Sequence, residues 1–150
     1  TSSKKTIHLN FLAMKSDIIK LCGETLESVE VRGDVFIIFR CKSGNTFYMY
    51  HEQDADETFE IAEIEGDFDS LIGEPIEFAD EIFDKKGYME MKEEQGYGVL
   101  TGTRSYVMYA IGTKNTEVKI RWYGESPGYF AKGITFELEE GLGNNNLLFN

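Results

Sequence analysis

The chain has 150 residues, the usual length of one domain, and 41% of them are hydrophobic, so it can form a core and a disordered chain is excluded. Its net charge of −12 is concentrated: seventeen acids and three bases between Glu52 and Glu94 give −14, while the remaining ten acids and twelve bases give +2. Such acidity disfavours direct binding to nucleic acids and to membrane surfaces.

The first half of the chain predicts one helical turn followed by strands. The helical turn is expected at residues 16–21, before Gly23. The later runs are β-branched or aromatic and are separated by turn signals such as Arg32-Gly33-Asp34. Strands are predicted at 26–31, 35–41, 46–51 and 58–63.

The second half predicts the same order of elements with one insertion. A helical turn is expected at 68–72, and the insertion at 84–96 is expected to be an exposed excursion with a helix over 84–95. The tail at 141–150 is expected to pack on the sheet or to dock on a partner. Strands are predicted at 76–83, 105–111, 116–123 and 135–140.

Three short blocks recur in the same order in residues 17–63 and 67–140. Asp17–Glu27 matches Asp67–Glu77 at five positions, Asn45-Thr46 recurs as Asn115-Thr116, and Thr58-Phe59-Glu60 recurs as Thr135-Phe136-Glu137. We therefore predict one domain spanning residues 1–150, mainly β, with antiparallel sheets built from two diverged copies of one motif and short helical pieces. Convergence on common strand patterns is the alternative to duplication.

Catalytic and metal-binding patterns have little support. Gly124–Gly128 resembles a serine nucleophile elbow, but Pro127 lacks the backbone N–H that would donate to an oxyanion. The acidic segment 51–57 lacks the oxygen spacing and the glycine of a calcium loop, and Cys22 and Cys41 have no metal-ligand spacing. A glycosidase-like carboxylate pair is defined by a distance, so that alternative stays open. We predict no enzymatic activity, no bound metal and no cofactor.

Two loops gather residue types that recognise partners. Segment 51–57 is acidic, whereas segment 121–129 carries an arginine, the only tryptophan and two tyrosines. Arg, Trp and Tyr dominate binding hot spots. If the loops meet, Arg121 is expected among the acids of 51–57, and Trp122 or Tyr129 is expected to offer an exposed face; a core position for Trp122 is the equal alternative. The predicted binding residues are His51, Gln53, Asp54, Asp56, Glu57, Arg121, Trp122, Tyr123, Ser126 and Tyr129.

These loops resemble a domain family of unknown function that occurs mostly in bacteriophage and prophage proteins. The resemblance covers roughly residues 20 to 140. Ala55 and Asp56 stand where the family has two cysteines, and Pro127 stands where it has asparagine, so no thiol or metal role is carried over. The matching residues are His51, Gln53, Asp54 and Glu57; Gly66, Asp67, Leu71, Ile72 and Gly73; and Arg121, Trp122, Gly124, Ser126, Gly128 and Tyr129.

The resemblance implies a phage accessory protein and brings no activity with it. We therefore expect a non-enzymatic binding protein that captures or inhibits a host protein in host takeover or anti-defence, with the acidic segment able to imitate the charge of DNA. A virion structural or accessory protein and a protein that sequesters a small polar ligand are the alternatives. The expected partner is a host or phage protein, with no membrane contact, and the expected location is the host cytoplasm or, in the alternative, the virion.

Overall fold

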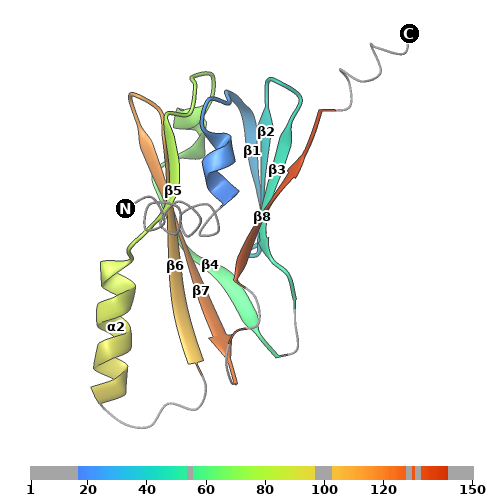
Figure 1. The fold of residues 1–150 in the computed structure, drawn as a ribbon. Helices are drawn as coiled ribbons and strands as arrows, with labels where there is room; N and C mark the ends of the chain where they lie inside the picture. Colours follow the sequence, from blue (N-terminus) through green and yellow to red (C-terminus); the bar gives the residue numbers. More distant parts are fainter. Residues whose placement is uncertain (1–16, 54–55, 97–102, 128–129, 131–132, 142–150) are drawn as a thin grey trace, which may run out of the picture.

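The computed structural model describes residues 17–53, 56–96, 103–127, 130 and 133–141, and they form a sandwich of two antiparallel sheets (Figure 1). The strands are β1 (Leu26–Arg32), β2 (Phe36–Cys41), β3 (Thr46–His51), β4 (Thr58–Glu65), β5 (Phe78–Ile82), β6 (Thr103–Gly112), β7 (Glu117–Ser126) and β8 (Ile134–Glu139). One sheet has the order β1-β2-β3-β8 and the other β4-β7-β6-β5. The predicted mainly β fold is confirmed.

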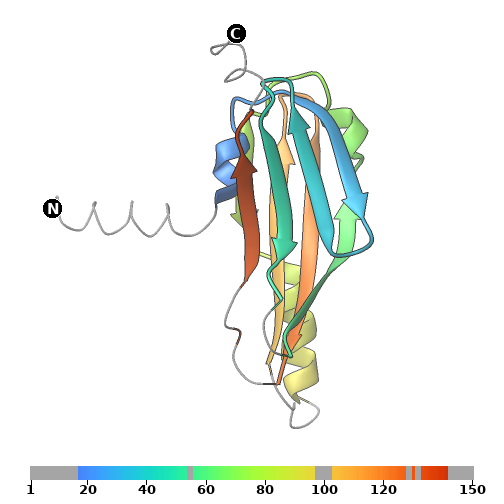
Figure 2. The same cartoon turned by 90° about the vertical axis from the view of Figure 1, so that its right-hand side faces the viewer.

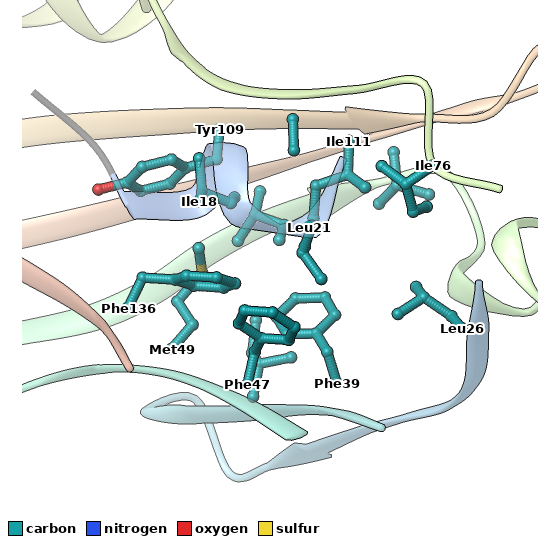
Figure 3. Packing of buried hydrophobic residues seen from close by; sticks show 14 of the residues in the cluster. Ile18, Leu21, Leu26, Phe39, Phe47, Met49, Ile76, Tyr109, Ile111 and Phe136 are labelled. Carbon is teal, nitrogen blue, oxygen red and sulfur yellow. The ribbon is translucent and has the colours of Figure 1, made fainter. Parts of the chain in front are cut away.

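The core lies between the two sheets because each strand alternates apolar and polar side chains, which point to opposite faces. On β7, Val118, Ile120 and Trp122 are fully buried, whereas Lys119 and Arg121 between them are half-buried on the outer face. Figure 3 shows the aromatic and aliphatic side chains that both sheets contribute to this core.

Two 3-10 helices close the sides of the sandwich. η1 (Asp17–Leu21) contacts β5 and β8, which are the edge strands on one side, and buries Ile18 and Leu21 completely. η2 (Phe68–Leu71) contacts β1 and β7 and buries Leu71. Both helical turns lie where the sequence predicted them, and they cover core that the sheets alone would leave open.

The two sheets have the same arrangement. In each, three strands that are consecutive in the chain lie side by side, and a fourth strand completes the sheet: β8 beside β3 in one sheet and β4 beside β7 in the other. At the turns before β1 and β5, Gly23 (φ 88°) and Gly73 (φ 90°) adopt the left-handed conformation that glycine favours. Gly23 N donates to Ile76 O at 2.8 Å, and Gly73 N donates to Leu26 O at 3.1 Å. A duplicated unit would give such reciprocal contacts; the duplication itself stays a prediction.

A second pair of equivalent contacts joins the turns to the third strand of each half. Asn45 Nδ2 donates to Glu24 Oε2 at 2.8 Å, and Asn115 Nδ2 donates to Glu74 Oε2 at 3.1 Å. These four residues belong to the blocks that recur in the sequence, so the recurring polar residues brace equivalent turns.

The connections at the other end of the sandwich cross between the sheets. β3 leads into β4 of the opposite sheet, and β7 leads into β8, which pairs with β3. The predicted helix of the insertion is present as α2 (Lys85–Gly96), beside β6 on the outside of its sheet (Figure 1). In the described part of the chain, no helix has the length and apolar character to cross a membrane.

Candidate functional site

Trp122 lies in the core and not on a binding surface. Its side chain is 0% exposed, between the paired positions Ile61 of β4 and Val107 of β6. The indole Nε1 donates to the sulfur of Met49, from the opposite sheet, at 3.4 Å. Of the two positions that the sequence left open for Trp122, the structure has the core position, because the alternation of β7 turns this residue inward.

His51 and Glu57 do come together, in a buried network at the loop end of the sandwich. Their side chains are 3% and 4% exposed, and His51 Nε2 lies 3.4 Å from Glu57 Oε1. His51 Nδ1 donates to Gly133 O at 2.8 Å, and Gln53 Nε2 donates to Glu57 O at 2.7 Å. Because a carbonyl oxygen only accepts, His51 carries a proton on Nδ1. The network fixes the β3–β4 connection against the start of β8.

Two clefts lie beside this network and share Thr58 and Glu125 in their walls. One has a volume of about 320 Å³ and includes Arg104; the other has a volume of about 420 Å³ and includes Val35. The loop end can therefore hold small polar groups. The predicted site residues in these walls are Gln53, Asp56, Tyr123 and Ser126.

Arg121 is held on the outer face of its sheet and is not part of the loop site for which it was predicted. Its Nε and Nη2 donate to the two carboxylate oxygens of Asp84 at 2.6 and 2.8 Å, and Nη1 donates to Glu63 at 2.8 Å. The Asp84 side chain is 3% exposed and that of Arg121 is 11% exposed. The hydrogen bonds from Arg121 to Asp84 raise the pKa of Arg121, so it stays charged. The prediction that Arg121 sits among the acids of 51–57 is wrong, because β4 and β7 pair Arg121 with Glu63.

The Arg121–Asp84 pair also fixes the start of α2. Asp84 takes the N-cap position, since its Oδ1 accepts from Gly87 N at 2.9 Å and its carbonyl accepts from Tyr88 N at 2.9 Å. The helix approaches β6 closely: a Cβ added at Gly87 would lie 2.5 Å from the Tyr106 ring. Tyr106 OH in turn donates to Glu90 at 2.8 Å. The first turns of α2 are thus anchored to the outer face of the sheet by charge, packing and hydrogen bonding.

Three large apolar side chains remain exposed where β5 leads into this anchored helix. Phe83 is 70% exposed, Met89 is 50% exposed and Tyr88 is 47% exposed. The rings of Phe83 and Tyr88 lie 5.7 Å apart. Contiguous exposed apolar side chains are unusual on a soluble domain and mark contact surfaces. We define the β5–α2 corner as Phe83, Lys85, Lys86, Tyr88 and Met89.

A cleft of about 330 Å³ opens beside the β5–α2 corner, and Phe83 contributes to its wall. Four basic and three acidic side chains line it, a net of +1 in a chain of net charge −12. Because Arg121 is committed to Asp84 and Glu63, the lysines are the cations best placed to meet a partner. Lys85 and Lys86 are such cations, whereas Lys119 lies 3.8 Å from Glu117.

A family model described as a domain of unknown function, DUF7448, matches residues 19–136. These residues make up well over half of the chain. The chain belongs to the DUF7448 family. No curated protein and no solved structure matches the chain.

The DUF7448 match runs from η1 into β8, so it includes both crossing connections, α2 and the β5–α2 corner. Six of the predicted residues lie around the loop end: His51, Gln53, Asp56, Glu57, Tyr123 and Ser126. Arg121 and Trp122 do not lie there. Two more, Asp54 and Tyr129, lie outside the described residues. The sequence prediction missed the corner. The sequence feature that could have indicated the corner is the pair of aromatic residues, Phe83 and Tyr88, at the start of an insertion expected to be exposed.

Proposed function

We propose that this DUF7448 protein is a non-enzymatic binding protein that captures another protein through the β5–α2 corner. We further propose that it is encoded by a bacteriophage and that the captured protein belongs to the host, as in host takeover or anti-defence. The observation that carries the proposal is the exposed group of Phe83, Tyr88 and Met89 on an element held in place by a buried ion pair.

The corner has the physical character of a binding hot spot. Aromatic and methionine side chains bring large contact areas, and burying Phe83 or Met89 against a partner would each contribute about 1.5–3 kcal/mol. Because α2 is anchored through Asp84 and Gly87, little helix ordering is needed on association. Lys85 and Lys86 favour a partner with acidic groups around an apolar centre.

Imitation of nucleic-acid charge is a less favoured variant of the same proposal. The outward acids of β4 face β7, where the sheet register pairs Glu63 with Arg121 and Glu65 with Lys119. Of these acids, Glu63 is neutralised by its ion pair with Arg121. The β5–α2 corner keeps its large apolar side chains exposed, which favours apolar contact over charge imitation as the basis of binding.

A second candidate function is the binding of a small polar ligand at the loop end. The two clefts there have volumes of about 320 and 420 Å³, the walls of the smaller one are mainly polar, and the buried His51–Glu57 pair holds their backbone in position. A virion structural or accessory role is a third candidate, and the identity of the captured molecule separates the three.

The experiment is affinity purification of the tagged chain from infected cells, followed by identification of what is bound. Phe83→Ala/Met89→Ala removes the apolar centre of the corner, and both side chains are exposed, so folding should be unaffected. Ile19→Ala is the matched control, because Ile19 is 58% exposed on η1 and lies outside the corner. We expect a host protein with the wild type and with the control, and at least a tenfold loss with the double substitution.

Other outcomes identify the competing functions. Capsid or tail proteins in place of a host protein would favour the virion role, and a bound metabolite would favour the loop-end clefts. A host protein that binds the double variant as tightly as the wild type would move the interface away from the corner. If reversal of exposed acids on β4 abolished that binding, charge imitation would replace the corner as its basis.

A further inference from the structure

A further cleft runs along β8, the strand at the end of the sheet β1-β2-β3-β8. Its volume is about 720 Å³. Phe136 and Leu138 supply an apolar wall, and both also pack in or against the core. Three acidic side chains and one basic side chain give the cleft a net charge of −2. They are Glu52, Glu137, Glu140 and Lys20. We call it the β8 cleft.

β8 has a free edge. It pairs with β3 on one side and with no described strand on the other, and Figure 2 shows it at the border of its sheet. Among the described residues, no backbone hydrogen bond joins β8 to an element other than β3. Alternate N–H and C=O groups of an edge strand point away from its neighbour, and native proteins usually cover or protect such a row. The β8 cleft therefore borders backbone groups that can pair with another strand.

The chain that precedes η1 joins the described structure beside this cleft. Asp17 is the first residue of η1, its carboxylate lies 3.8 Å from Lys20 Nζ, and Lys20 is part of the cleft wall. Residues 1–16 are therefore tethered next to β8. An extended chain advances about 3.3 Å per residue, so residues 8–16 can span about 30 Å, whereas β8 spans about 20 Å. A tether this short gives the segment an effective concentration in the millimolar range.

Residues 1–16 carry charge opposite to that of the β8 cleft. They contain three lysines and no acidic residue, a net charge of +3, while residues 17–150 hold the other twelve bases and all twenty-seven acids, a net charge of −15. The lysines are Lys4, Lys5 and Lys15. Opposite charge favours this segment at the cleft and disfavours the acidic remainder of the chain there.

Residues 8–15 also repeat the apolar pattern of β4. When the recurring blocks are aligned, Asp17 falls on Asp67, so residues 8–15 fall on β4, which lies just before η2. The bulge of β4 between Ile61 and Glu63 lets its apolar side chains face the core although their spacing changes from two residues to three. The same spacing occurs before η1. The matching residues are Leu9, Phe11 and Met14 in one segment and Phe59, Ile61 and Ile64 in the other.

We propose that residues 8–15 add a strand to the free edge of β8, with the lysines of residues 1–16 beside the acidic walls of the β8 cleft. The place beside β3 that corresponds to the place of β4 beside β7 is occupied by β8, so the free edge of β8 is the next position in that sheet. Leu9 and Phe11 then cover the apolar wall. The added strand protects an edge that would otherwise be open to pairing with another chain.

Residue-resolved hydrogen exchange of the full chain tests the proposal through the β8 amides that face the free edge. Leu9→Ser/Phe11→Ser removes two of the three matching apolar side chains. His8→Ser/Asn10→Ser is the matched control, because it changes the intervening positions of the same alternation. We expect exchange of the edge-facing amides to become at least about tenfold faster in the first variant and to stay within about twofold of the wild type in the control. The β8 amides that face β3 should stay protected in both variants, which shows that the sheet is intact.

Charge reversal supplies a second readout. Reversing the three lysines should accelerate exchange of the edge-facing amides, and reversing the acidic walls as well should restore it to within about threefold of the wild type. The first set is Lys4→Glu/Lys5→Glu/Lys15→Glu, and the second adds Glu52→Lys/Glu137→Lys/Glu140→Lys.

Three results would overturn the proposal. One is unchanged exchange of the edge-facing amides in Leu9→Ser/Phe11→Ser, or equal acceleration in its control. Another is a combined charge variant that exchanges as fast as the lysine-reversed chain. The third is protection that rises with protein concentration between about 20 and about 500 μM, because a second copy would then be the occupant of the edge.

Discussion

Arg121→Met tests whether the ion pair beneath the β5–α2 corner has the structural role assigned to it. The substitution keeps an apolar stem but leaves the buried Asp84 carboxylate with Gly87 N as its remaining donor among the bonds described above. Removing one partner of a buried pair costs about 3–5 kcal/mol. The bond from Arg121 to Glu63 adds less than about 1 kcal/mol, because the Glu63 side chain is 52% exposed. Asp84 lies near the surface and can relax toward water, so we expect about 3 kcal/mol, or roughly 6–12 °C in Tm.

The assay is thermal and urea unfolding followed by circular dichroism, combined with hydrogen exchange over residues 85–96. We expect early exchange in α2, because the helix loses the ion pair that anchors its start to the sheet. Glu63→Gln is the control and should cost less than about 1 kcal/mol. Replacing both charges, in Arg121→Met/Asp84→Leu, should recover part of the loss, since no unpaired buried charge remains, although the N-cap of α2 is removed. A cost for Arg121→Met no larger than that of Glu63→Gln would refute the reasoning.

The remaining predictions concern the core, the thiols, the helix contact and metals. Trp122→Ala should destabilise the fold by about 3–5 kcal/mol in urea unfolding, because it empties a fully buried site; a cost below about 1 kcal/mol would contradict that burial. Burial raises the pKa of the Cys41 thiol to about 12, so little thiolate forms at pH 8, and a thiol reagent should modify the exposed Cys22 alone until denaturant exposes Cys41. Gly87→Ala would stabilise an isolated helix by about 1 kcal/mol, but contact with the Tyr106 ring should make it destabilising here, and a rise in Tm would show that α2 does not pack so closely. Chelation should leave the Tm unchanged, whereas stoichiometric zinc in the purified protein would contradict the predicted absence of a metal site.

The sequence by itself determined the local structure of this protein. Alternation of apolar and polar residues set the strands, as in 46–51, where Phe47 and Met49 are buried and Tyr48 and Tyr50 point outward. Left-handed glycines marked the turns at 23 and 73, and the helical pieces appeared near their predicted positions. These features depend on interactions between near neighbours, which a single chain segment already contains.

The grouping of His51, Gln53 and Glu57 also depends on near neighbours in the sequence. His51, Gln53 and Glu57 lie within seven residues, so their meeting needs only a turn between two strands. Their contact with Gly133 could not be foreseen, because it depends on where β8 lies. β8 pairs with β3 across more than 80 residues of sequence.

Only the tertiary structure decided which side of each strand meets the core. Alternation defines two faces, but a shift of one residue exchanges them, so Trp122 and Arg121 could not be assigned inward and outward from residue type alone. The packing of the two sheets and the course of the chain after β5 then set the partners of both residues. Arg121 pairs with Asp84, 37 residues away, and Trp122 contacts Met49, 73 residues away. Such contacts arise from the packing of two sheets, and no local pattern encodes that packing.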